Sequence, residues 1–169
     1  MNDAMVVRIS LADQQLVLQH GDQVRCQFAV STAVNGANER NGSGGTPRGW
    51  HRIRLQIGAG CPVGTVFRGR RLTGECYSPD LAARYPERDW ILTRILWLSG
   101  LESGINRGGM VDTLRRLIYI HGCPDHEPMG VPRSHGCIRM RNTEIVELFD
   151  QVKVGTLVQI IAGSLTETP

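Results

Sequence analysis

The chain has 169 residues, 41% hydrophobic but only 5% aromatic, so it suits one domain, residues 1–169, whose core depends on aliphatic side chains. Its formal net charge of +3 at pH 7 is too small to indicate a nucleic-acid-binding surface, and we expect no such partner. Twenty Gly and eight Pro predict an architecture rich in turns.

The sequence shows none of the usual signals for membrane insertion or export. No stretch reaches the roughly 18 apolar residues of a membrane span, and the first residues lack the basic start and apolar run of a signal peptide. The five Cys have irregular spacing, which makes a poor disulfide framework. We therefore expect free thiols, a cytoplasmic location and no membrane partner.

The first half of the chain predicts short strands joined by turns. Apolar runs rich in β-branched residues, with a turn at Gly21–Asp22, predict strands over 5–11, 14–20, 23–32, 50–58 and 64–72. Residues 35–49 contain five Gly and three Asn and predict a loop. Residues 78–89 predict a helical turn or two that ends before Pro86.

The second half adds three strands and the clearest helix. The strands are expected over 90–100, 115–122 and 155–161, with loops over 102–110 and 123–136. A helix is expected over 142–152, with Asn142 as its N-cap and an apolar stripe along one face. The pattern predicts a mostly β domain with a late helix beside the 123–136 loop.

Five of the ten His and Cys residues lie between positions 121 and 137: His121, Cys123, His126, His135 and Cys137. Polar neighbours and a preceding Gly argue against Cys137 as a core residue. A zinc site would use such side chains, and His121 and His126 have a suitable spacing, but neither Cys pair does. A zinc-stabilised binding module without enzymatic activity therefore stays open as an alternative to a catalytic site.

A nucleophilic Cys137 accounts for more of these residues together. Such a Cys needs a base, and His121 stands at the end of a predicted strand, 16 residues upstream (137 − 121). The carbonyl of Gly122 would hold the imidazole ring. The consecutive N–H groups of His135, Gly136 and Cys137 would face an oxyanion, and Arg139 would favour a thiolate.

These residues resemble a known family. His121-Gly122 followed by SHGCIRM at 134–140, with STAVNG and GTPRGW between 31 and 50 upstream, resembles the L,D-transpeptidase catalytic domain, also called YkuD, over about residues 5–162. The resemblance implies a mostly β, sandwich-like fold with a short helix next to the catalytic loop. It also implies Cys137 as nucleophile and His121 as base, with no cofactor and no metal.

The resemblance implies further roles within the same loop. Ser134 is expected to hydrogen-bond there, with His135 and Gly136 shaping the oxyanion site. Arg139, Arg133 and Arg141 flank the nucleophile and are candidate partners for substrate carboxylates. Cys123 has no role that the resemblance assigns.

Family members act on peptidoglycan stem peptides through a thioester, which an amine or water then resolves. For a cytoplasmic protein, water is the expected acceptor, and muropeptides or free stem tetrapeptides are the expected substrates. We therefore expect an L,D-carboxypeptidase of cell-wall recycling that releases the terminal D-Ala and is acylated by carbapenems. The alternative within the family is an L,D-transpeptidase that forms crosslinks or exchanges D-amino acids.

Overall fold

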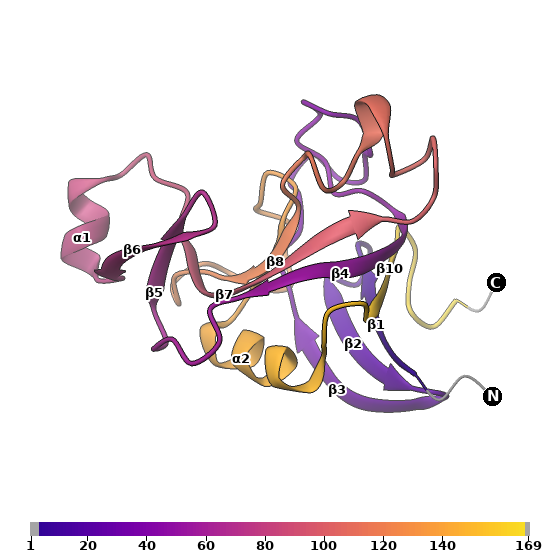
Figure 1. Ribbon diagram of the computed structural model, residues 1–169, viewed down its shortest axis with the longest axis horizontal. Helices are drawn as coiled ribbons and strands as arrows, with labels where there is room; N and C mark the ends of the chain where they lie inside the picture. The colour runs from indigo at the N-terminus through magenta and orange to yellow at the C-terminus, as the bar shows by residue number, and fades with distance from the viewer. Residues whose placement is uncertain (1–3, 168–169) are drawn as a thin grey trace.

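The computed structural model describes residues 4–167, which form ten strands, two α-helices and one 3-10 helix. The strands are β1 (Met5–Ser10), β2 (Gln15–His20), β3 (Gln23–Ala29), β4 (Gly49–Ile57), β5 (Thr65–Arg68), β6 (Arg71–Cys76), β7 (Ile91–Gly100), β8 (Tyr119–Gly122), β9 (Ile138–Met140) and β10 (Leu157–Ile161). The helices are α1 (Pro79–Arg84), the 3-10 helix η1 (Gly109–Val111) and α2 (Asn142–Gln151) (Figure 1). Neither α-helix in this range is long and apolar enough to cross a membrane.

All ten strands belong to one mixed sheet. Its main path runs β3-β2-β1-β10-β4-β7-β5-β6, and β8 joins β7 to β9. The pairs β1–β10 and β8–β9 are parallel, whereas the others are antiparallel. The sheet also returns toward its start, because Ser31, just after β3, pairs with Arg139 of β9 through two backbone hydrogen bonds of 2.9 and 3.0 Å. The mostly β, sandwich-like expectation is thus confirmed in a curled sheet.

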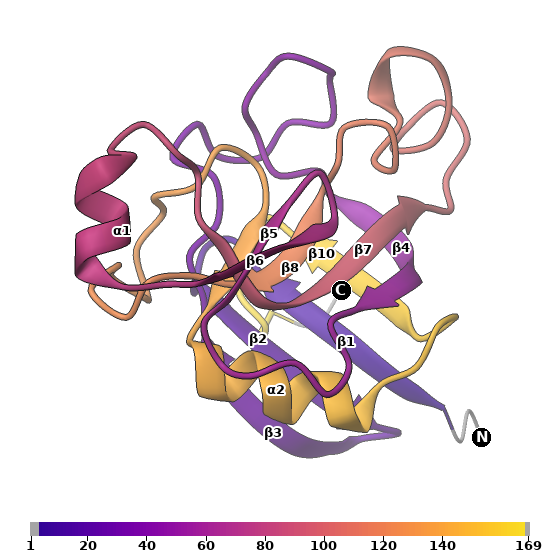
Figure 2. The same cartoon turned by 60° about the vertical axis from the view of Figure 1, so that its left-hand side comes forward.

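The main core lies inside this curl. Buried aliphatic residues from β1, β2, β4, β7, β8, β9 and β10 meet one another there, and α2 adds Ile145, Leu148 and Phe149. The helix lies along β7 and β8 (Figure 2). Burying one such aliphatic side chain contributes about 1.5–3 kcal/mol to the stability of the fold. Because aromatic residues are scarce, packing of aliphatic side chains is the main source of stability in this core.

Three sequence expectations differ from the structure. The strand expected over 64–72 is a hairpin, β5–β6, which turns at Gly69–Arg70, where both φ angles are positive. The apolar run 115–122 pairs as a strand only from Tyr119, because residues up to 117 form turns. The helix N-cap is Arg141 rather than Asn142, whose side chain is engaged elsewhere.

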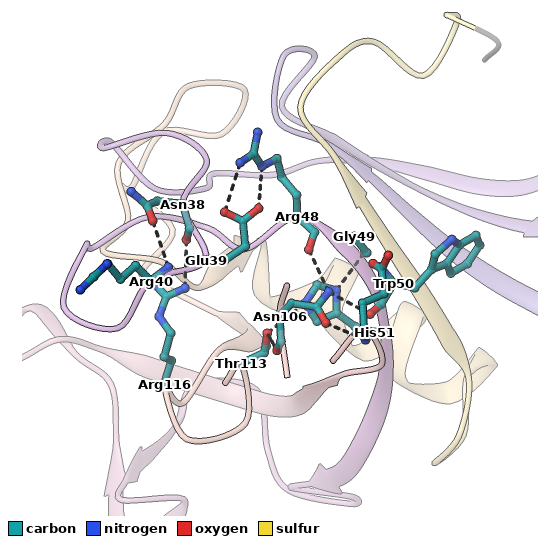
Figure 3. A network of polar contacts seen from close by, with 11 residues as sticks. Asn38, Glu39, Arg40, Arg48, Gly49, Trp50, His51, Asn106, Thr113 and Arg116 are labelled. Atoms are coloured by element: carbon teal, nitrogen blue, oxygen red, sulfur yellow. Dashed lines mark hydrogen bonds and ion pairs between the residues drawn. The ribbon is translucent and has the colours of Figure 1, made fainter. Parts of the chain in front are cut away.

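A buried polar network joins β4 to the loop before β8 (Figure 3). The His51 ring is fully buried, with Nδ1 3.0 Å from the Gly49 carbonyl oxygen and Nε2 3.1 Å from Thr113 Oγ1. Asn106, also fully buried, donates from Nδ2 to the carbonyls of Arg48 and Trp50. Burial lowers the pKa of His51 to about 4, so the ring is neutral at pH 7.

This buried imidazole predicts a loss of stability in mild acid. Below pH 6.5 the unfolded chain binds a proton at His51, whereas the folded chain does so only near pH 4. The free energy of unfolding should therefore fall by about 2 kcal/mol more between pH 7 and pH 5 in the wild type than in His51→Gln. Urea denaturation at the two pH values measures this difference. Equal losses in both proteins would contradict the prediction.

Candidate active site

The parallel pairing of β8 with β9 brings the predicted nucleophile and base together. Ile120 is opposite Ile138, and His121 is opposite Arg139. Since side chains alternate along a strand, the two Ile point into the core and the flanking residues point out of it. Cys137 therefore lies beside Tyr119, whose backbone N is 3.3 Å from Sγ, and on the same face as His121, diagonally across the two strands.

His121 is held in the tautomer that a general base requires. The side chain is 1% exposed, and Nδ1 lies 2.6 Å from the carbonyl oxygen of Gly122. Because a carbonyl can only accept, Nδ1 carries the proton and Nε2 keeps its lone pair. Burial lowers the pKa of His121, so the ring is neutral at pH 7.

The Cys137 thiol is neutral in the resting protein. Burial raises its pKa to about 12, while the Tyr119 N–H and the positive charges of Arg139 and Arg116 oppose that rise. The thiol donates to the carbonyl of Leu117 at 3.3 Å. A neutral thiol on the same face as a neutral imidazole would become an active nucleophile when His121 takes its proton.

The catalytic loop is fixed by side-chain bonds to its own backbone and to the upstream loop. Ser134 Oγ donates to the Cys137 carbonyl at 2.5 Å and accepts from the Gly136 N–H at 3.2 Å. Gly136 has a φ of +134°, a conformation that favours glycine, and its carbonyl accepts from Thr46 Oγ1 at 2.9 Å. Because its N–H is directed to Ser134, Gly136 contributes to the site mainly through the shape of the loop.

The STAVNG stretch runs alongside this loop. The Thr32 carbonyl accepts from the N–H groups of Arg133 and Ser134, each at 2.9 Å, and the Ser134 carbonyl accepts from Val34 N–H at 3.0 Å. Ala33 N–H donates to Thr46 Oγ1 at 3.0 Å. The two upstream motifs therefore act as a frame for the loop that carries Cys137.

Behind the base, Gly122 has no room for a side chain. A Cβ there would lie 2.5 Å from Asn142 Oδ1 and 2.7 Å from the Leu92 carbonyl oxygen. Asn142 accepts from Thr93 Oγ1 at 2.6 Å and donates to the Cys123 carbonyl at 2.8 Å. Thr93 has a φ of +74°, which is unusual for a β-branched residue, so this end of β7 is strained next to the catalytic strand.

The cations near the thiol are held in different ways. Arg139 lies between Asp89 and Glu127 at 3.6 and 3.5 Å, and Arg141 donates from Nη1 to the carbonyls of Asp125 and Glu127. Arg133 is exposed. The substrate-binding role of these three residues stays a prediction.

Arg116 was not singled out from the sequence, since nothing near it in the chain marks a site. It donates to the carbonyl of Asn38 at 2.9 Å (Figure 3). It also donates to the carbonyl of Gly45 at 2.6 Å, which places its charge close to Gly136 of the catalytic loop. Burial lowers the pKa of Arg116, an effect that the nearby Cys137 and Glu39 oppose. Its guanidinium supports a thiolate that forms at Cys137.

The remaining His and Cys residues are separate from the nucleophile. His126 and His135 are both exposed, and Cys123 is buried with Sγ 3.4 Å from the Met140 carbonyl oxygen. Burial raises the pKa of Cys123 to about 12, which makes it unreactive. Within residues 4–167 no three His, Cys, Asp or Glu side chains are grouped as metal ligands, so the zinc alternative finds no ligand set there.

A small cavity adjoins the site on the Arg139 side. It has a volume of about 220 Å³, and its walls include Asp89, Cys123, Glu127, His135 and Arg139. Asp89 and Arg139 also act electrostatically on both His121 and Cys137. The cavity therefore borders the site through Asp89 and Arg139.

The tautomer of His121 can be measured directly. At pH 7 the 15N spectrum of the imidazole should show a protonated Nδ1 and an unprotonated Nε2, because the Gly122 carbonyl accepts from Nδ1. The neutral ring should persist below pH 6.5, since burial lowers its pKa. Two protonated ring nitrogens at pH 7 would instead show a thiolate–imidazolium pair, and an Nε2–H tautomer would contradict the geometry.

Comparison with known proteins agrees with this arrangement. The family model of the L,D-transpeptidase catalytic domain, YkuD, matches residues 4–160. The probable L,D-transpeptidase ErfK/SrfK of Escherichia coli is 54% identical over 46 residues, which is 27% of this chain and 15% of that protein. The aligned part is thus a small share of that relative's length.

Solved structures resemble nearly the whole chain. The structure of L,D-transpeptidase 3 from Mycobacterium tuberculosis in complex with a faropenem-derived adduct has a TM-score of 0.56 at 14% identity, covering 93% of this chain and 60% of that one. The structure of LdtMt1 in complex with imipenem has a TM-score of 0.56 at 17% identity, covering 94% of this chain and 59% of that one. At these identities the likeness concerns the fold.

Proposed function

We propose, from the premise that this chain belongs to the L,D-transpeptidase catalytic domain (YkuD) family of cysteine acyl-transfer enzymes, that it is an L,D-carboxypeptidase. Its substrates would be muropeptides or free stem tetrapeptides, from which it removes the terminal D-Ala to leave tripeptides. The observation that carries the proposal is the placement of Cys137 and the buried His121 on one face of the β8–β9 pair, with His121 Nδ1 held by the Gly122 carbonyl.

The first half of the reaction forms a thioester. His121 Nε2 takes the thiol proton as Sγ attacks the carbonyl carbon at the L-centre of the diamino acid. The resulting oxyanion faces the backbone of the catalytic loop, and Arg116 lies near Cys137 to offset the developing negative charge. His121 then returns the proton to the amide nitrogen, the C–N bond breaks, and D-Ala leaves with a free amine.

The second half of the reaction releases the tripeptide. His121 Nε2 takes a proton from water, whose oxygen attacks the thioester carbonyl. The C–S bond breaks, the proton passes back to Sγ, and the tripeptide leaves with a carboxyl group.

A transpeptidase that forms crosslinks or exchanges D-amino acids is the second candidate. Asp89 and Glu127 line the cavity, and their carboxylates would attract the ammonium group of an acceptor amine. A role in cytoplasmic cell-wall recycling is part of the carboxypeptidase proposal, because the proposed substrates of the carboxypeptidase are soluble stem peptides. The five free cysteines are compatible with a reducing compartment.

The experiment incubates the protein with a diaminopimelate-containing tetrapeptide and follows the products by mass spectrometry, with and without a D-amino acid as a competing acceptor. Tripeptide formation that the added amine barely changes supports the carboxypeptidase. Predominant exchange or dimer formation would replace it with the transpeptidase. Absence of any conversion would contradict both.

Two substitutions test the assigned roles in this assay. Cys137→Ala should abolish turnover without unfolding the protein, and His121→Ala should lower the rate by ~10²-fold or more because the base is lost. Cys76→Ser, which changes an exposed thiol, is the matched control and should retain activity. The acid limb of kcat/KM should lie below pH 6.5, since burial lowers the pKa of His121. Activity above a few per cent in Cys137→Ala would overturn the nucleophile assignment.

A carbapenem should acylate the same thiol. Sγ attack opens the β-lactam ring, its nitrogen takes the proton, and the intact mass rises by one whole carbapenem. The imipenem complex and the faropenem-derived adduct of the two similar structures support this expectation. Cys76→Ser should gain the same mass and Cys137→Ala none. An adduct that persists in Cys137→Ala would assign the reaction to another cysteine.

A further inference from the structure

A row of three side chains extends from the thiol across neighbouring strands. Cys137 lies beside Tyr119 of β8, and Tyr119 is opposite Trp97 of β7. The two aromatic rings meet edge to face, with centroids 6.0 Å apart. Tyr119 and Trp97 thus form an aromatic floor that begins at the sulfur and ends under the β5–β6 hairpin.

Arg70 covers the far end of this floor. It occupies the hairpin turn with a φ of +64°, and its guanidinium carbon lies 4.7 Å from the centre of the Trp97 ring. Nη1 donates to the Tyr119 hydroxyl at 3.0 Å. The stack and the hydrogen bond hold the charge in place, so little side-chain freedom remains to be lost when a ligand binds.

Arg70 differs from the other cations of the site in its partners. Arg139 already has two carboxylates near it, and Arg116 donates to backbone carbonyls. Within residues 4–167, Arg70 forms no ion pair with a carboxylate, and its other guanidinium N–H groups remain for a ligand. Planar guanidinium groups bind carboxylates through paired hydrogen bonds.

We propose that Arg70 binds the C-terminal carboxylate of the residue that Cys137 releases, with Tyr119 and Trp97 as the floor beneath that residue. Tyr119 links the two ends of this arrangement, since its backbone N lies 3.3 Å from Sγ and its hydroxyl accepts from Arg70 at 3.0 Å. This inference rests on the proposed function. It assigns to Arg70 the specificity of the enzyme for substrates with a free terminal carboxylate.

The test compares two substrates, a tetrapeptide that ends in free D-Ala and the same peptide with a C-terminal amide. Wild type should prefer the free acid in kcat/KM by on the order of 10- to 100-fold, as expected for a lost charge-assisted hydrogen bond. Arg70→Gln should lose about that factor on the acid and little on the amide. Arg70→Lys should restore part of the preference.

Arg68→Gln is the matched control, because Arg68 flanks the same turn, has the same charge and is exposed. It should keep the wild-type preference for the acid. If Arg70→Gln lowers kcat/KM equally for the acid and the amide, or does not lower it at all, the inference is overturned. Arg70 would then only stabilise the β5–β6 hairpin.

A binding measurement separates this inference from the proposed function. Titration of both peptides into Cys137→Ala, with and without Arg70→Gln, reports carboxylate recognition without turnover. If wild type converts neither peptide, the proposed function fails, and a preference for the acid that Arg70→Gln abolishes still supports the carboxylate site. Equal affinity of Cys137→Ala for the acid and the amide would overturn it.

Discussion

The parallel pairing of two very short strands, β8 and β9, determines the geometry of the whole site. Ile120 and Ile138 are both fully buried, and their packing in the main core fixes the register of the pair. A slip by one residue would remove these side chains from the main core and place Cys137 and His121 in it. The cost of removing the Ile pair from the main core therefore keeps Cys137 and His121 together on the opposite face of the two strands.

Such short strands need support from outside their own pairing. Ser31 completes the sheet against Arg139, and Thr46 bonds both Ala33 and Gly136, so the 31–46 segment holds the catalytic loop from two sides. The buried Asn106 and His51 network in turn anchors the end of that segment to β4 (Figure 3). Polar bonds that are shielded from water thus transmit the rigidity of the core to a glycine-rich loop.

Local patterns predicted most of the strands and both helices, because apolar periodicity can be read along the chain. Motif spacing suggested Cys137 and His121 as the reacting pair, and their catalytic role stays a prediction. The match over residues 4–160 confirms the family resemblance that the motifs suggested. The three-residue strand β9 was missed because it is too short to show any periodicity. Asn142 looked like an N-cap, yet Thr93 and Cys123, which are distant in sequence, compete for its side chain.

Arg70 and Arg116 could not be found from the sequence for a related reason. Both reach the site across the fold, from a hairpin turn and from the segment before β8, and the chain contains eighteen Arg, so none stands out. The arginines that flank Cys137 in sequence have other neighbours in space. Sequence motifs point to candidate reacting residues, whereas the charges around these residues depend on tertiary contacts.

Burial of Cys137 and His121 determines the protonation state of both groups before substrate binds. A Cys137 pKa of about 12 and a neutral His121 mean that little thiolate exists before substrate binds. Proton transfer then requires an electrophile in place, because only bond formation to carbon removes the negative charge from a sulfur that is costly to ionise. Cations that flank the thiol from opposite loops lower that cost without removing it. Reactivity is therefore greatest toward a carbonyl that the site has already positioned, and lower toward small electrophiles that it cannot hold.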